Sequence, residues 1–67
     1  MHRNNLRKLR KERGWAMGRL SAESGVSLCW VDMIELGYIN PGMEVREKLA
    51  RALKVQVDEV FPVESNR

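Results

Sequence analysis

The chain has one histidine and one cysteine, the two residue types that most often act as catalytic base and nucleophile. His2 lies beside the N-terminus, and Cys29 has no second thiol and no histidine near it in sequence. A nucleophilic cysteine needs an activating base nearby, and a phosphate-binding loop needs a glycine-rich run that is absent here. The sequence therefore indicates a non-enzymatic protein without a metal site or cofactor. Cys29 is better explained as a small apolar residue of a binding surface.

The residues that can bind a partner fall into two groups, one basic and one apolar. The basic group lies between positions 3 and 19 and comprises Arg3, Arg7, Lys8, Arg10, Lys11, Arg13 and Arg19. Its side chains form either a solvated face or a phosphate-contacting one, and for the second role the candidates are Arg7, Arg10, Lys11 and Arg19.

The segment from Leu20 to Val45 contains no Lys or Arg. Its acidic residues, Glu23, Asp32, Glu35 and Glu44, give it a formal charge of −4. Because non-specific affinity for DNA comes mainly from cations that neutralise phosphates, this segment by itself should repel a nucleic-acid backbone.

Length and composition favour one small helical domain spanning positions 1–67. The chain has a net charge of +3 and a sequence pI near 9.5, which suits a nucleic-acid partner but is common on other domains as well. A chain this short, with no internal disulfide, must rely on compact packing. No signal peptide or membrane-length apolar run is visible, so we expect a cytoplasmic protein.

Capping residues and apolar spacing predict the first two helices. The first runs from Leu6 to Arg13 after an Asn cap, ends at Gly14, and turns Leu6 and Leu9 inward. The second is expected from Trp15 to Ser24, with Trp15 and Leu20 in the core and Gly25 closing it.

The same signals place the third helix between Ser27, its expected cap, and Gly37, with Val31 and Ile34 facing the core. A fourth helix from Met43 to Lys54 carries an inward stripe of Val45, Leu49, Ala52 and Leu53. A last short turn around 58–61 is stopped by Pro62, and residues 63–67 should fray. The sequence thus predicts an all-α bundle of about five short helices.

Several segments together resemble the Cro/C1-type (XRE) helix-turn-helix family of phage and bacterial repressors. They are LRKLRKERGW at 6–15, SGVS at 24–27, IELG at 34–37, Asn40-Pro41, LARALKV at 49–55 and DEVF at 58–61. The resemblance covers nearly the whole chain. It implies a lambda-repressor-like fold and DNA binding by the third helix in the major groove.

The chain departs from this family where family members touch DNA. Position 17, usually a Gln that meets phosphate, is Met17, and the usual Ser or Thr cap before it is Ala16. The base-contacting positions of the third helix, which usually carry Arg, Gln, Ser, Thr or Asn, are Leu28, Cys29, Asp32 and Met33. None of these is a good hydrogen-bonding base reader. Leu36 and Tyr38 replace residues that are often polar or basic.

Apolar residues at these positions favour a protein-binding module on a repressor scaffold. We expect one protein-binding surface made of Met17, Leu28, Cys29, Trp30, Asp32, Met33, Leu36, Tyr38, Ile39 and Met43. Trp30 and Ile39 can alternatively tuck into the domain's own core. The partner is a foreign protein or a second copy of the chain, and specific DNA binding should be weak or absent.

The main alternative function is that of a sequence-specific, DNA-binding transcriptional regulator acting as a dimer, with the basic segment supplying phosphate contacts. Two origins of the apolar surface also stay open. So dense a set of replacements fits a designed protein, and natural drift towards a protein partner would leave the same pattern.

Overall fold

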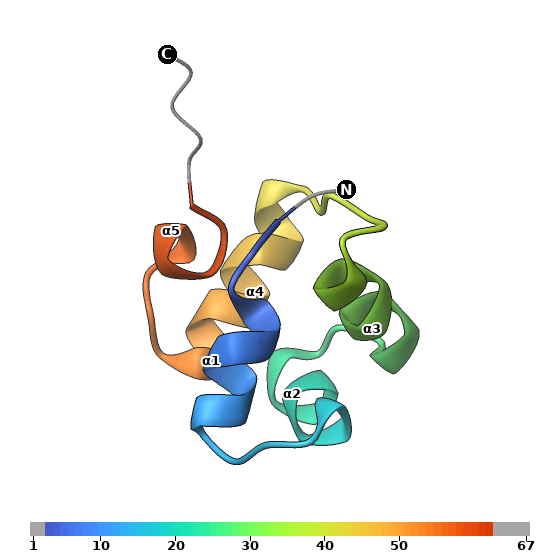
Figure 1. Cartoon of the computed structure of the whole chain (residues 1–67), viewed down its shortest axis with the longest axis vertical. Helices are drawn as coiled ribbons and strands as arrows, with labels where there is room; N and C mark the ends of the chain where they lie inside the picture. Colours follow the sequence, from blue (N-terminus) through green and yellow to red (C-terminus); the bar gives the residue numbers. More distant parts are fainter. Residues whose placement is uncertain (1–2, 63–67) are drawn as a thin grey trace.

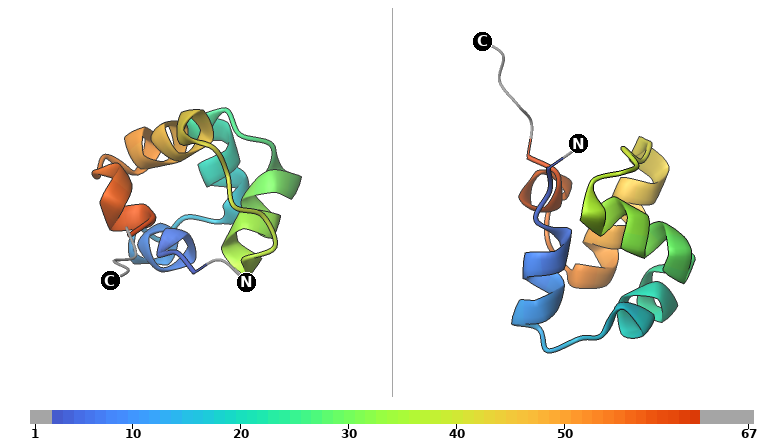
Figure 2. Two further views of the ribbon diagram at one scale, coloured as in Figure 1. Left: turned by 90° about the horizontal axis from the view of Figure 1, so that it is seen from above. Right: turned by 45° about the vertical axis from the view of Figure 1, so that its right-hand side comes forward.

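The computed structural model describes residues 3–62, and the chain forms five helices within this range (Figure 1). They are α1 (Leu6–Glu12), α2 (Met17–Ser24), α3 (Leu28–Leu36), α4 (Met43–Leu53) and α5 (Val57–Val60). The predicted all-α fold is therefore confirmed. Viewed from above, the helices surround one core (Figure 2). No helix in the described part of the chain is long and apolar enough to cross a membrane.

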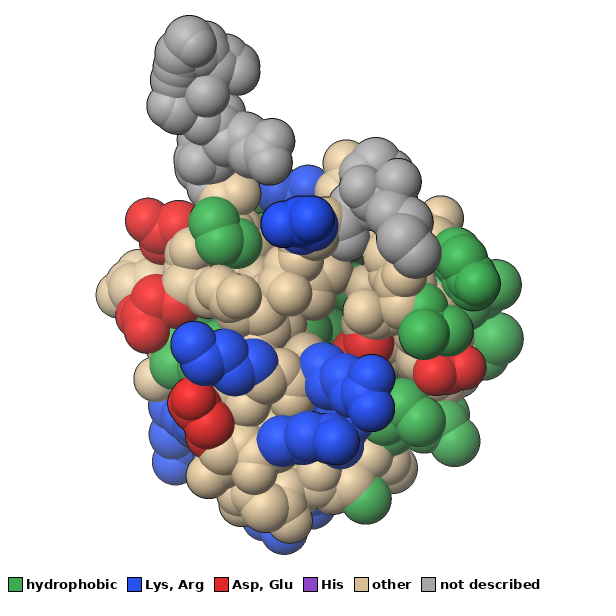
Figure 3. All heavy atoms as spheres, in the orientation of Figure 1, with side chains coloured by type: hydrophobic (Ala, Val, Ile, Leu, Met, Phe, Trp, Pro, Cys, Tyr) green, Lys and Arg blue, Asp and Glu red, His purple; other side chains and the backbone are tan. Residues whose placement is uncertain are grey.

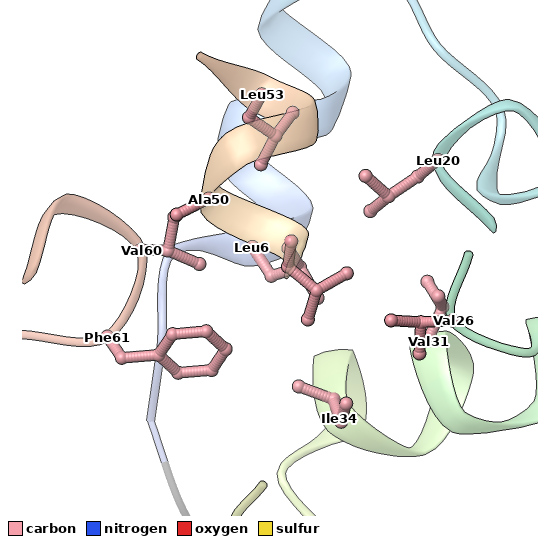
Figure 4. Packing of buried hydrophobic residues seen from close by; sticks show 10 residues of the cluster. Leu6, Leu20, Val26, Val31, Ile34, Ala50, Leu53, Val60 and Phe61 are labelled. Carbon is pink, nitrogen blue, oxygen red and sulfur yellow. The ribbon is translucent and has the colours of Figure 1, made fainter. Parts of the chain in front are cut away.

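One hydrophobic core joins all five helices (Figure 4). The side chains that are completely shielded from solvent are Leu6, Leu20, Val31, Ile34, Leu49, Leu53 and Val60. Six of these were expected from helical spacing, the exception being Val60. Burial of one Leu or Ile side chain stabilises the fold by roughly 1.5–3 kcal/mol.

Some core assignments from the sequence need correction. Leu9, Trp15, Val45 and Ala52 are only partly buried and pack against the edge of the core. Four core residues were missed, namely Val26, Ala50, Val60 and Phe61. Val26 lies in the turn and Phe61 follows the last helix, so neither belongs to a helical stripe that spacing could reveal.

Several predicted helix bounds were wrong by one or two residues: the first helix ends at Glu12, not Arg13, and the last spans Val57–Val60 instead of 58–61. The second helix begins at Met17, not Trp15, because Ala16 has an extended backbone and serves as the N-cap residue. The fourth ends at Leu53, because Lys54 adopts a left-handed conformation with φ of +60°. The expected fraying of residues 63–67 lies outside the described residues.

Asn4 and Asn5 fix the start of α1 against two other helices. The Asn4 side-chain oxygen accepts a hydrogen bond from the Leu6 N–H, while its Nδ2 donates to the Ile34 carbonyl at 2.9 Å. Asn5 occupies the N-cap position, but its side chain donates to the Glu59 carbonyl instead of capping the helix. Both residues therefore hold α1 between α3 and α5.

Candidate nucleic-acid interface

The turn between α2 and α3 is held by a short network of local hydrogen bonds. Gly25 ends α2 with φ of +76°, a conformation that other residues adopt only at a cost. The Ser21 hydroxyl donates to the Val26 carbonyl at 2.7 Å, and the Ser24 hydroxyl accepts from the Val26 N–H at 3.1 Å. Ser27 then caps α3 by accepting from the Trp30 N–H at 3.2 Å, as predicted. The orientation of α3 relative to α2 is therefore well defined.

The two faces of α3 have opposite environments, as its sequence predicted. Val31 and Ile34 are fully buried, whereas Leu28, Met33 and Leu36 are 50%, 37% and 44% exposed. The positions that resemble base-contacting residues therefore lie on the solvent side of the helix.

Exposed apolar side chains continue from α3 into the following loop and the start of α4. We use the name apolar surface for the six large exposed hydrophobic residues Leu28, Trp30, Met33, Leu36, Tyr38 and Met43. Hydrophobic side chains gather over α3, beside the Lys and Arg side chains over α1 (Figure 3). Trp30 is 43% exposed and so does not join the core.

Met17 and Ile39, expected in the same surface, are both partly buried against the core. For Ile39 this matches the alternative that the sequence left open. For Met17, the first residue of α2, it corrects the expectation of a solvent-facing side chain, because this side chain packs against the core cluster. Cys29 is exposed, and Asp32 is half-buried.

Arg10, a candidate phosphate contact, is instead a buried structural residue, and this corrects its assigned role. Its guanidinium donates to both carboxylate oxygens of Glu35, at 2.7 and 3.0 Å, and also to the Trp15 carbonyl at 2.8 Å. The hydrogen bond to Glu35 raises the pKa of Arg10 above its ordinary value, with the charge of Glu35 adding to it and burial opposing it. Arg10 therefore ties α1 to α3 and to the loop before α2.

The role of Glu35 was not predicted, although the sequence carries a signal for it. Glu35 follows Ile34 and lies close to the inward stripe of α3, where an unpaired carboxylate would be costly. Only 4% of its side chain is exposed. A buried acid at that position demands a cation from another element, and Arg10 supplies it from 25 positions away.

Two other acidic residues of the segment 20–45 also have basic partners. Glu23 accepts from Arg19 at 2.8 Å, and Glu44 lies 3.9 Å from the Lys48 ammonium. With Glu35 bound to Arg10, three of the four acids are paired with cations from outside that segment. Among residues 3–62, Asp32 alone of the four has no ion pair. These ion pairs offset part of the negative charge that was counted for this segment.

The remaining phosphate candidates are accessible to solvent. Arg7 and Lys11 are exposed and lie four positions apart, so they share one side of α1. The Arg19 side chain is 56% exposed, and its guanidinium lies 4.7 Å from the centre of the Trp15 ring. These three side chains can meet an anionic partner.

The start of α2 also presents free backbone donors. Ala16 provides no side-chain cap, and within residues 3–62 the backbone N–H groups of Met17 and Gly18 have no acceptor. Nothing lies within 4 Å of the position that a side chain on Gly18 would occupy. An acceptor oxygen can therefore approach this helix end closely.

The described residues contain no cluster of three or more His, Cys, Asp or Glu side chains that could hold a metal ion. The geometry instead combines a two-helix unit, an exposed helix face and flanking cations, which together define a helix-turn-helix binding domain. The family model described as helix-turn-helix matches residues 6–60 of the chain. The chain belongs to this helix-turn-helix family, of Cro/C1 type.

A curated relative adds a second comparison. The HTH-type transcriptional regulator SlrR of Bacillus subtilis (strain 168) is 34% identical to the chain over 61 residues. The match covers 90% of this chain but 40% of SlrR, so the chain spans less than half the length of that relative. Neither comparison supports a designed protein or a protein-binding module, and both favour the alternative, a DNA-binding transcriptional regulator.

Proposed function

We propose that this chain is the DNA-binding domain of a transcriptional regulator. The main observation behind this proposal is the capped α2–α3 unit, in which the inner face of α3 is buried and the outer face is exposed to solvent. A helix held in this way can enter the major groove of duplex DNA without unfolding or rearranging its neighbours. Membership of the helix-turn-helix family and similarity to a transcriptional regulator support this function.

In this proposal the phosphate contacts come from Arg7, Lys11 and Arg19, with the free N–H groups at the start of α2. Each guanidinium or ammonium that displaces a condensed counterion adds affinity without adding sequence preference. The helix dipole of α2 adds a partial positive charge beside Arg19. Glu35 and Glu44 are paired with cations outside this set, whereas Arg19 has to exchange its exposed ion pair with Glu23 for a phosphate.

We further propose that the regulator binds as a dimer, with two copies of α3 entering half-sites one helical turn apart. Repressor operators pair two half-sites about 34 Å apart, and a second domain doubles the phosphate contacts. The elements that pair two subunits need not lie in this chain, which spans 40% of the SlrR length.

The experiment that tests this function is chemical-shift mapping of the ¹⁵N-labelled chain. A pool of short random-sequence duplexes serves as the first probe, and a duplex selected from that pool serves as the second. We expect the largest shifts at Met17 to Arg19 and along the outer face of α3. Shifts confined to the opposite side of the molecule, around α5, would contradict the proposal.

A second candidate function, protein binding, is favoured by the large exposed side chains that continue beyond α3. Tyr38 and Met43 are 65% and 58% exposed, and an aromatic and apolar patch of this kind is typical of interface cores. The proposed contact residues are those of the protein-binding surface predicted from the sequence, of which Met17 and Ile39 contribute only their exposed atoms. Gel filtration over a range of concentrations tests the self-association form of this candidate. A dimer that Leu36→Lys converts to a folded monomer would favour protein binding.

A further inference from the structure

The outer face of α3 has almost no hydrogen-bond donors for base edges. Between Leu28 and Leu36 there is no Arg, Lys, Gln, Asn, Ser or Thr. The Glu35 carboxylate is bound by Arg10. An ionised Asp32 carboxylate has acceptors but no donor. The indole N–H of Trp30, which is 43% exposed, is the one strong side-chain donor on this helix, so α3 cannot make the two-donor contact to guanine that Arg or Lys makes.

The same face offers apolar contact to a different feature of DNA. Leu28 and Met33 are 50% and 37% exposed, and they lie on the solvent side of α3. In the major groove the one apolar group on a base edge is the C5 methyl of thymine. The exocyclic amino group of cytosine is the donor that a carboxylate such as that of Asp32 prefers.

From these contacts, and resting on the DNA-binding function proposed above, we infer that α3 recognises pyrimidine-rich half-sites through thymine methyl groups. Leu28 and Met33 pack on the methyl groups, and Asp32 accepts from a cytosine amino group between or beside them. Five residues of helix rise by about 7.5 Å, which matches roughly two base-pair steps of 3.4 Å. The two apolar side chains can thus reach bases two steps apart on one strand.

The test compares duplexes that differ only in the methyl group. A duplex is selected from a random-sequence pool, and each thymine near its centre is then replaced singly by deoxyuridine, which keeps the same base pair. Burial of one methyl group corresponds to about a fourfold change in affinity. We expect uracil to weaken binding about fourfold at each contacted thymine and to have no effect elsewhere.

Substitutions in the protein distinguish a direct contact from a general effect of uracil on the duplex. Met33→Ala should bind the thymine and uracil duplexes equally at the position that Met33 contacts, whereas Met33→Leu should keep the preference. Arg7→Ala should weaken binding to both duplexes by the same factor, because a phosphate contact does not depend on the methyl group. Met33 is exposed, so circular dichroism should show the same helical content for both variants.

The outcomes separate this inference from the proposed function on which it rests. If no duplex is selected and none binds, DNA binding itself is overturned. If a duplex binds specifically but uracil substitution has no effect at any position, the domain binds DNA by other contacts and the methyl inference is overturned. A dimer that Met33→Lys dissociates would also overturn it, since a second copy would then cover this face.

Discussion

Arg10 illustrates how a single residue can belong to a basic segment and yet serve the fold. Its side chain is 9% exposed, and it makes two hydrogen bonds to Glu35 and one to a backbone carbonyl. A count of basic residues cannot separate this role from the role of Arg7, which lies three positions earlier and is exposed. The distinction depends on a partner 25 positions away, which only the tertiary structure brings near.

The buried pair leads to a stability prediction. Arg10→Ala leaves the Glu35 carboxylate buried without its partner and should lower the free energy of unfolding by roughly 3 kcal/mol. Arg7→Ala, the matched control on the same helix, should change it by less than about 0.5 kcal/mol. Urea denaturation of both variants checks this. Similar losses for the two variants would mean that the pair does not hold α1 to α3.

The raised pKa of Arg10 also determines how the stability of the pair depends on pH. A cation whose pKa is higher in the folded than in the unfolded protein stabilises the fold fully below its unfolded pKa. That stabilisation disappears only as the pH rises through the folded pKa, which lies above the ordinary value for arginine. We therefore expect no loss from this pair between pH 7 and pH 10 in thermal melts. An Arg10-dependent drop in that range would contradict the assignment.

Lys54 carries a second prediction at the level of single residues. It is the one non-glycine residue with positive φ among the described residues, and it ends α4 in the left-handed conformation. Glycine adopts this conformation without the steric cost of a Cβ atom. Lys54→Gly should therefore stabilise the domain by about 0.5–1 kcal/mol in urea melts. Glu47→Gly, at an exposed position in the middle of α4, should instead destabilise it by about 1 kcal/mol.

At the level of elements, the existence and order of the helices followed from the sequence. Gly25, Ser27 and Gly37 mark the limits of α3 through local geometry, and local geometry is encoded by neighbouring residues. The errors lay where tertiary contacts decide. Trp15 packs against the core edge from the loop before α2, outside any helix.

The two faces of α3 give a prediction for the element as a whole. Ile34→Ala removes a fully buried side chain and should cost roughly 2–5 kcal/mol of unfolding free energy. Met33→Ser, one position earlier on the exposed side, should cost little. Urea melts of the two variants make the comparison. Equal losses would show that Met33 contributes to the core as much as Ile34 does.

At the level of the whole molecule, the sequence predicted the fold better than the function. The fold depends on a repeated pattern of apolar residues and caps, which survives changes at the surface. The functional assignment depended on apolar residues at the base-contacting positions and on the charge of the segment 20–45, and that charge is partly offset by Arg10, Arg19 and Lys48 from outside it. Charge counted along the chain thus overestimated the repulsion that a DNA backbone would meet.

The number of phosphate contacts determines how steeply the DNA affinity of the whole molecule falls with salt concentration. If Arg7, Lys11 and Arg19 each neutralise one phosphate, the logarithm of the association constant of one domain should fall with log salt with a slope of about −2.7. Arg7→Ala should reduce the magnitude of that slope by about 1. Binding curves at several salt concentrations measure both. A slope unchanged by Arg7→Ala would show that Arg7 does not contact a phosphate.

The most direct test of DNA recognition is a fluorescence anisotropy titration with two labelled duplexes at one fixed salt concentration. One duplex is selected by the chain from a random pool, and the other has the same base composition in shuffled order. We expect the selected duplex to bind more tightly by about tenfold or more, and substitutions on the outer face of α3 to remove the difference. Equal affinity for both duplexes, with substitutions on α3 having no effect, would contradict a DNA-reading role for this helix and favour the protein-binding function instead.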